Sequence, residues 1–142
     1  IKAGITHDEM VQNLDFAQTF LEAAGIDAPD DMQGESLIPL LTESGKDWTR
    51  DAVYYHYYEY PSVHMVKRHY GIVNKDYKLV RFYYDVDEWE LYDRKNDPNE
   101  MNNVYNDPEY SDIVSDLKIQ LAELRKKYKD SEELDQKFIY KN

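Results

Sequence analysis

Residues 69–84 read His69-Tyr-Gly-Ile-Val-Asn-Lys-Asp-Tyr-Lys-Leu-Val-Arg-Phe-Tyr-Tyr84, two runs of strand-forming residue types joined by a polar turn. Tyrosine, valine and phenylalanine favour strands, and Asn74-Lys75-Asp76 has the composition of a tight turn. Residues 52–60 and 89–92 have the same strand-like character, and Pro61 ends the first of these runs. Four strands in sequence, separated by short connections, predict an antiparallel meander.

Helical periodicity flanks this predicted sheet on both sides. Before it, Thr6–Glu9 has the spacing of a capping box, and an apolar stripe follows as far as Gly25. This pattern predicts a helix from the capping box to Gly25, and its stripe is wide enough to require a larger partner. After the sheet, Asp107-Pro108 predicts the start of a long helix that covers one sheet face. The two stripes are Val11, Leu14, Ala17, Leu21 and Ala24, and Ile113, Val114, Leu117, Leu121, Leu124 and Tyr128.

Two shorter segments complete the expected α+β fold. Ser36 is placed to cap a short helix that ends near Leu41, and the polar stretch from Thr42 to Asp51 indicates a boundary. We therefore expect one region over residues 1–45 and a second over residues 46–142. Beyond Asp130 the sequence is charged and aperiodic, which predicts a loosely held tail.

Composition excludes several classes of protein. The chain has 142 residues and a formal net charge of −12, so its overall field disfavours nucleic acid and anionic lipid as partners. No apolar run approaches the roughly 18 residues that cross a bilayer. The absence of cysteine excludes disulfides, thiolate metal ligands and a cysteine nucleophile from this sequence. Because the sequence starts without Met, we expect a piece of a longer protein.

One segment runs against the acidic background. Residues 62–81 hold five basic residues and one acidic residue, a net charge of +4, together with two histidines. Such donors suit a small anion, since arginine can bind sulfate or carboxylate oxygens in pairs while tyrosine rings stack on a sugar. Alternatively the basic residues balance nearby acids such as Asp85, Asp87 and Glu88, and composition alone favours this second explanation.

No catalytic or metal-binding pattern emerges from spacing. His56 lies in the middle of a predicted strand, where a hydrogen-bonded core histidine is more common than a catalytic base. His64 and His69 have no acidic residue at ligand spacing, and the acids at 85–88 lack the pattern of an EF-hand. No glycine-rich phosphate loop or nucleophile elbow is present. We therefore predict no catalytic residue and no metal ligand in this chain.

Three segments carry a resemblance to a known family. Residues 11–25 end in Ala-Gly, residues 32–41 contain Gln-Gly-Glu-Ser-Leu, and residues 90–103 contain Glu-Leu-Tyr-Asp, Asp-Pro, Glu and Asn in order. Together they resemble the C-terminal part of the formylglycine-dependent sulfatases, which belong to the alkaline-phosphatase-like superfamily. Gln18 stands where that family usually has proline, and Glu35 where arginine is frequent. Residues 54–71 are most similar to bacterial N-acetylglucosamine-6-sulfatases and mucin-desulfating sulfatases.

This resemblance implies both a fold and a division of labour. Residues 1–45 would be the last helices of a large α/β catalytic domain, and residues 46–142 a small four-stranded antiparallel sheet packed by a C-terminal helix. The family's formylglycine arises in a Cys/Ser-x-Pro/Ala-x-Arg motif that this sequence lacks, and its calcium ligands lie upstream. The isolated chain would then be inactive, and its partners would be that catalytic domain and a sulfated sugar or glycan. The resemblance further implies a periplasmic or secreted protein, or a lysosomal one in a eukaryote.

The basic segment supplies the predicted substrate contacts. We expect His64, Lys67, Arg68 and His69 to bind sugar hydroxyls or a substrate anion, with Tyr58 and Tyr60 beside them. Two alternatives remain open at this point. One is a stand-alone carbohydrate-binding or interaction module, against which a large exposed apolar face on the first helix would speak. The other is part of a related phosphoesterase or phosphonate hydrolase.

Overall fold

A computed structural model describes residues 1, 3–42 and 48–139 and divides the chain into two compact units, Ile1–Val53 and Tyr54–Asn142. The boundary predicted between residues 45 and 46 lies outside the described residues. That the first unit belongs to a large α/β domain stays a prediction. Each unit is described separately below.

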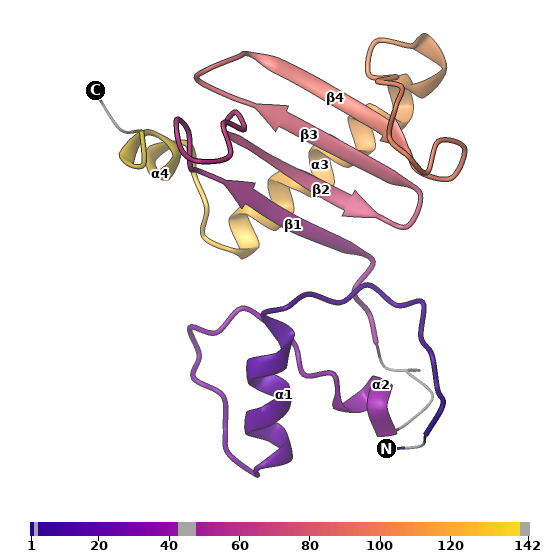
Figure 1. The fold of residues 1–142 in the computed structure, drawn as a ribbon, viewed down its shortest axis with the longest axis vertical. Coiled ribbons are helices and arrows are strands. Elements are labelled where there is room, and N and C mark those ends of the chain that lie inside the picture. The colour runs from indigo at the N-terminus through magenta and orange to yellow at the C-terminus, as the bar shows by residue number, and fades with distance from the viewer. Residues whose placement is uncertain (2, 43–47, 140–142) are drawn as a thin grey trace. The chain divides into compact units, whose positions relative to one another are not determined.

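The strands form one four-stranded sheet, as the sequence predicts. They are β1 (Ala52–Tyr57), β2 (His69–Asn74), β3 (Tyr77–Phe82) and β4 (Glu88–Asp93), in the order β1-β2-β3-β4. Strand β3 is antiparallel to both β2 and β4, with Leu79 opposite Ile72 on one side and Leu91 on the other. The drawn strand directions alternate across the sheet (Figure 1). The meander is therefore confirmed.

The predicted turn fixes the register of the central hairpin. The Oδ1 atom of Asn74 accepts hydrogen bonds from the backbone N–H groups of Asp76 and Tyr77, at 3.0 and 2.6 Å. A short polar side chain at this position can bond to the backbone two or three residues on, which is why asparagine favours turns.

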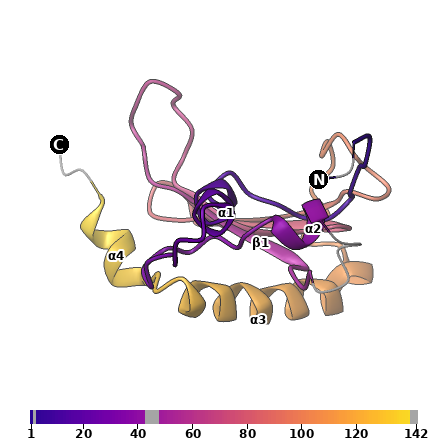
Figure 2. The ribbon, with the colours of Figure 1, turned by 90° about the horizontal axis from the view of Figure 1, so that it is seen from below.

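A long helix lies along one face of the sheet (Figure 2). The Asp107 carboxylate accepts from the Glu109 N–H at 3.0 Å and caps the 3-10 helix η1 (Pro108–Tyr110), which leads into α3 (Ser111–Lys127). Because strand side chains alternate between faces, Ile72, Leu79 and Leu91 all point to the same side, and all three are fully buried. The buried α3 residues that complete the core are Val114, Leu117 and Leu121.

The prediction of a loose tail after Asp130 is wrong. Residues Glu132–Lys137 form helix α4, whose first turn is capped by the Ser131 hydroxyl accepting from the Leu134 N–H at 3.3 Å. The Arg125 Nη2 atom donates to both carboxylate oxygens of Asp135, at 3.1 and 2.8 Å. A charged residue thus anchors the segment, which is why an apolar periodicity did not reveal it.

The first unit contains helices α1 (Asp15–Ala23) and α2 (Ile38–Thr42). The prediction for α2 is confirmed, with the Ser36 hydroxyl accepting from the Ile38 N–H at 3.2 Å. Helix α1 starts much later than predicted, and Thr6–Glu9 does not cap it. Its start is set instead by Asp15, whose carboxylate accepts from the Gln12 and Glu35 N–H groups.

The buried face of α1 is polar. Its buried residues are Asp15, Gln18 and Thr19. Arg50 donates to both carboxylate oxygens of Asp15, at 2.5 and 2.8 Å, and the Thr19 hydroxyl accepts from the Leu37 N–H at 2.8 Å. The side of α1 that packs within this unit is therefore polar. That the wide apolar stripe requires a larger partner stays a prediction.

The apolar side chains of this region are left uncovered. Phe16 and Phe20 are 52% and 69% exposed and stack on each other, with ring centroids 6.3 Å apart. Val11, Leu14 and Ile26 are exposed as well. Contiguous exposed apolar side chains mark a surface that another protein or domain covers. Among the described residues, no helix combines the length and the apolar character needed to span a membrane.

Candidate functional site

The β1–β2 loop, residues 58–68, carries three of the four residues predicted to bind substrate. The fourth, His69, is the first residue of β2. The loop tip is open to solvent, with Val63 90% and Met65 62% exposed and His64 exposed between them. The four residues are therefore neighbours in sequence but have different surroundings.

Arg68 is buried at the base of the loop, with only 1% of the residue exposed. Its Nε–H donates to the Tyr58 carbonyl at 3.2 Å, and its Nη1 donates to both carboxylate oxygens of Asp85 at 2.9 Å. Hydrogen bonds between ionised partners are roughly twice as strong as those between neutral groups. Arg68 therefore closes the loop by joining its last residue to its first.

Lys67 and His69 lie on either side of that closure. The Lys67 ammonium donates to the Tyr60 hydroxyl and lies 3.8 Å from the centroid of that ring. The His69 Nδ1 atom lies 2.8 Å from the Lys67 carbonyl oxygen, so this nitrogen carries the proton. The His69 ring stacks on Tyr57, with centroids 5.6 Å apart. The structure thus leaves His64 as the most accessible of the four predicted residues.

Much of the remaining basic charge is paired with acids. Arg81 forms an ion pair with Asp87, and the Lys78 ammonium lies 2.5 Å from a Glu100 carboxylate oxygen. These basic residues, and Arg68 with Asp85, therefore balance nearby acids, which is the second explanation that the sequence offered for the basic segment.

His69 also borders a cavity of about 440 Å³ on the sheet. Tyr55, Val80 and Tyr92 are among its lining residues. Val80 alternates with the core residue Leu79, so the cavity lies on the face away from α3. His69 and the buried Arg68 consequently point to opposite sides of the sheet.

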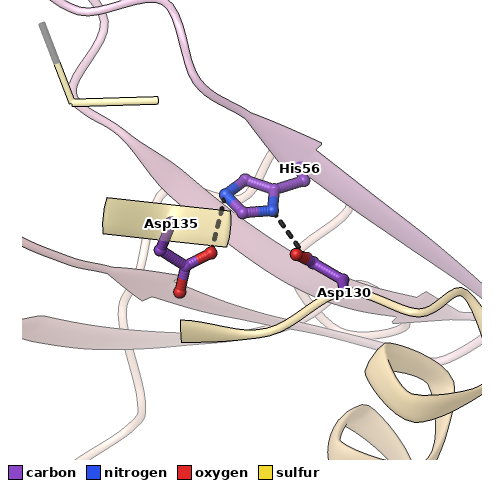
Figure 3. Close-up of side chains that lie close together, drawn as sticks. All are labelled: His56, Asp130 and Asp135. Atoms are coloured by element: carbon purple, nitrogen blue, oxygen red, sulfur yellow. Dashed lines mark hydrogen bonds and ion pairs between the residues drawn. The ribbon is translucent and has the colours of Figure 1, made fainter. Parts of the chain in front are cut away.

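His56 lies at the centre of a second, buried cluster that joins β1 to the C-terminal segment (Figure 3). Its Nδ1 atom lies 2.7 Å from Asp130 Oδ2, and its Nε2 atom lies 2.7 Å from the Tyr83 hydroxyl and 3.7 Å from Asp135 Oδ1. The side chains of His56, Asp130 and Asp135 are 4%, 6% and 6% exposed. Both ring nitrogens have a partner, as expected for a core histidine.

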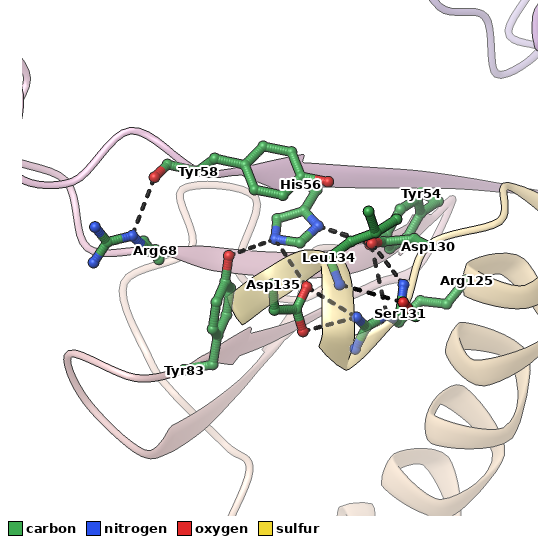
Figure 4. A network of polar contacts seen from close by, with 10 residues as sticks. All are labelled: Tyr54, His56, Tyr58, Arg68, Tyr83, Arg125, Asp130, Ser131, Leu134 and Asp135. Carbon is green, nitrogen blue, oxygen red and sulfur yellow. Dashed lines mark hydrogen bonds and ion pairs between the residues drawn. The ribbon is translucent and has the colours of Figure 1, made fainter. Parts of the chain in front are cut away.

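Further donors surround the two carboxylates (Figure 4). The Tyr54 hydroxyl donates to Asp130, and Arg125 bonds to Asp135 while its guanidinium lies 3.9 Å from the Tyr70 ring centroid. Buried charges require such partners, because an unpaired carboxylate in the interior is costly. The cluster is thus a satisfied network.

Burial sets the protonation of this network. Burial lowers the pKa of His56, although the nearby Asp130 carboxylate acts in the opposite direction. Hydrogen bonds from Tyr54 and His56 outweigh burial and lower the pKa of Asp130. Burial raises the pKa of Asp135 despite the Arg125 guanidinium. A neutral His56 therefore donates from Nδ1 to Asp130 and accepts at Nε2 from the Tyr83 hydroxyl.

This network does not fit calcium, the metal that the family resemblance implies elsewhere in the protein. His56, Asp130 and Asp135 offer ligand atoms within 4.8 Å of one another. Calcium prefers six to eight oxygen ligands, whereas this cluster contains an imidazole and a guanidinium that already occupy the carboxylates. We derive no metal chemistry from it.

Sequence reasoning missed this network because its members are far apart. His56 precedes Asp130 by 74 residues, and neither spacing nor charge links the two before the fold is known. The one available signal was a histidine in the middle of a tyrosine-rich strand.

Comparison with known proteins gives consistent matches. The family model described as N-sulphoglucosamine sulphohydrolase, C-terminal, matches residues 1–127. The N-acetylglucosamine-6-O-sulfatase of Bacteroides thetaiotaomicron is 53% identical over 135 residues, which cover 93% of this chain and 24% of that protein. A protein solved in complex with its substrate D-glucosamine-2-N,6-O-disulfate is 54% identical, with a TM-score of 0.78, and the match covers 83% of this chain and 24% of that one.

A more distant structure shares the fold alone. It is the phosphonate monoester hydrolase of Agrobacterium radiobacter, 24% identical with a TM-score of 0.64, and the match covers 80% of this chain and 24% of that one. This chain thus spans about a quarter of the length of these relatives.

Proposed function

Because the chain belongs to the family of N-sulphoglucosamine sulphohydrolase C-terminal domains, we propose that it is the C-terminal part of a sulfatase that hydrolyses sulfate esters of glycans. The resemblance drawn from residues 11–25, 32–41 and 90–103 is thereby confirmed. The observation that carries the proposal is the 53% identity to an N-acetylglucosamine-6-O-sulfatase over 93% of the chain. The proposed substrate is accordingly a sulfated amino sugar.

In this proposal the reacting groups lie outside the chain. The formylglycine nucleophile and the calcium ion would belong to an N-terminal catalytic domain, since this sequence has neither cysteine nor the modification motif. When bound there, calcium polarises the sulfate group. The present chain contributes scaffold and one wall of the substrate pocket.

The exposed face of α1 supports the catalytic domain as partner. Phe16 and Phe20 need an apolar surface, and a domain of the same protein supplies one permanently. A stand-alone binding module would leave these rings in water, which speaks against that alternative.

The pocket wall is proposed to be the β1–β2 loop. His64 and Lys67 would contact sugar hydroxyls or a substrate anion, with the Tyr58 and Tyr60 rings beside them. Arg68 and His69 would hold the base of the loop and define its edge. The loop combines imidazole and ammonium donors with aromatic rings, the groups that recognise a sulfated sugar.

Kinetics of the full-length enzyme on a 6-sulfated N-acetylglucosamine test this assignment. His64→Ala and Lys67→Met should raise KM about three- to tenfold with a smaller effect on kcat, because binding contacts are lost. Lys95→Ala, which removes an exposed cation outside the loop, is the matched control. Unchanged KM values in both loop variants would remove the loop from the substrate site.

A parallel assay separates the phosphonate hydrolase alternative. The full-length enzyme should hydrolyse a sulfate ester in preference to a phosphonate monoester with the same alcohol. The reverse preference would replace sulfatase by phosphonate hydrolase activity while leaving the fold assignment intact.

We also propose a periplasmic or secreted location, or a lysosomal one in a eukaryote, which cell fractionation with an antibody to the native protein would test.

A further inference from the structure

The C-terminal segment, residues 130–139, is fixed to the sheet by its charged residues. Asp135 is bound by Arg125 of α3, and Asp130 by His56 and Tyr54 of β1. Both carboxylates are buried, so detachment of the segment would leave the largely buried Arg125 guanidinium without the Asp135 carboxylate and His56 without its Asp130 acceptor. Helix α4 thereby has a defined position beside β1 (Figure 1).

From this position the segment reaches the first residue of the β1–β2 loop. The Tyr58 ring stacks on His56, with centroids 3.7 Å apart and planes at 24°. On α4's C-terminal side, the Phe138 ring packs against the same tyrosine with centroids 5.1 Å apart. The Tyr58 ring is therefore held by two rings. Phe138 belongs to the C-terminal segment, and His56 is hydrogen-bonded to Asp130 of that segment.

Tyr58 in turn fixes the end of the loop. Its carbonyl accepts from Arg68 Nε (Figure 4). Arg68 in turn donates to Asp85. The loop tip has few contacts of its own, since Val63, His64 and Met65 are exposed. The geometry of the base therefore decides where the tip lies.

We propose that residues 130–139 are a brace that positions the β1–β2 loop, and hence its sugar-binding groups, through His56, Phe138 and Tyr58. The proposal rests on the proposed function for its consequence on substrate binding, but the brace itself is a property of this structure. The match to the family model ends at Lys127, so Asp130, Asp135 and Phe138 lie beyond the matched residues.

Phe138→Ala in the full-length enzyme is the direct test. The side chain is 44% exposed, so its removal weakens the contact with Tyr58 at little risk to the core. Phe138→Leu keeps an apolar contact with Tyr58 and should therefore behave much more like the wild type than Phe138→Ala does. Ile119→Ala, which truncates an exposed apolar residue on α3, is the control for a general loss of apolar surface.

Hydrogen exchange of the loop reports on the brace without reference to activity. The amides of Tyr60 and Met65 donate to the Tyr58 and Ser62 carbonyls, at 3.0 Å each, and both are expected to exchange about fivefold faster or more in Phe138→Ala. Peptides from β3 and β4 should keep their exchange rates. An unchanged loop, or an equal acceleration in Ile119→Ala, would overturn the brace.

Substrate kinetics then separate the brace from the proposed function. Phe138→Ala should raise KM for the sulfated sugar about three- to tenfold while kcat changes less, because a misplaced loop binds poorly. Faster loop exchange with unchanged KM would keep the brace and refute the loop as a substrate wall. Unchanged exchange with raised KM in His64→Ala would refute the brace and keep the substrate wall.

Discussion

At the scale of single residues, the protonation of His56 affects the stability of the fold. Burial lowers the pKa of His56 below its usual value near 6.5, so the folded state takes up a proton less readily than the unfolded state. Stability should therefore fall as the pH drops from about 6.5 through the folded pKa. The ionisable and aromatic groups that face His56 are Tyr54, Tyr58, Tyr70, Tyr83, Arg125, Asp130 and Asp135.

His56→Gln isolates this contribution. Glutamine can donate to Asp130 and accept from Tyr83, but it does not titrate. We expect the variant to melt at a lower temperature near pH 7 and to lose less of its Tm between about pH 7 and 5 than the wild type. The raised pKa of Asp135 acts in the opposite sense, because its protonation stabilises the folded state as pH falls. Parallel Tm profiles for the two proteins would contradict a neutral buried His56.

In the first unit, the Asp15 carboxylate stabilises the fold by binding the buried Arg50 guanidinium. Asp15→Asn removes the carboxylate that binds both Nη atoms of Arg50 and leaves the Glu35 carboxylate at 3.8 Å, which should destabilise this unit by up to about 3–5 kcal/mol. Hydrogen exchange of the Glu35 and Leu37 amides, which donate to Asp15 and Thr19, measures the loss locally. The exposed Asp8→Asn serves as control, and equal exchange in both variants would deny Asp15 this role.

At the scale of elements, local patterns predicted most of the second unit. The four strands, the Asn74 turn and the Asp107 cap are each encoded within a few residues, so short windows of sequence suffice. Helix α1 begins later than its apolar periodicity suggests, because the Asp15 carboxylate accepts from the Gln12 N–H and from the distant Glu35 N–H at the start of the helix. Helix α4 was missed for the same reason, since its anchor is an ion pair to α3.

Helix α3 allows a test of the sheet core. Leu117 is 2% exposed, so Leu117→Ala should cost about 2–5 kcal/mol through lost burial and the cavity left behind. Ile119 lies two residues further on the same helix and is 61% exposed, and Ile119→Ala should change stability by about 0.5 kcal/mol or less. Urea denaturation and hydrogen exchange of the β2 and β3 amides both measure the loss of stability in the two variants. A similar loss of free energy of unfolding in both would place the core elsewhere.

At the scale of the whole molecule, the sequence located the loop but not its arrangement. The sequence grouped four residues because they lie in one short basic segment: His64, Lys67, Arg68 and His69. In the structure, Arg68 is buried at the base of the loop, whereas His69 is the first residue of β2 and points to the opposite face of the sheet. The loop's support from Asp130 and Phe138 depends on contacts more than 70 residues away, which no local window contains. Substrate contact by His64 and Lys67 stays a prediction that the kinetic variants address, and that by Arg68 and His69, now proposed to hold the loop base, stays untested.

The division of labour between this chain and a catalytic domain predicts a difference in activity. The 142 residues alone should hydrolyse no sulfate ester, because they hold neither the formylglycine motif nor a cluster suited to calcium among the described residues. The full-length enzyme should be active, and Phe16→Ser with Phe20→Ser should lower its Tm, since both exposed rings then lose an apolar partner surface. In the isolated chain the same double change should instead reduce aggregation, measured by light scattering. Turnover by the isolated chain, or equal behaviour of the double variant in both contexts, would contradict a domain that covers α1 and carries the reaction.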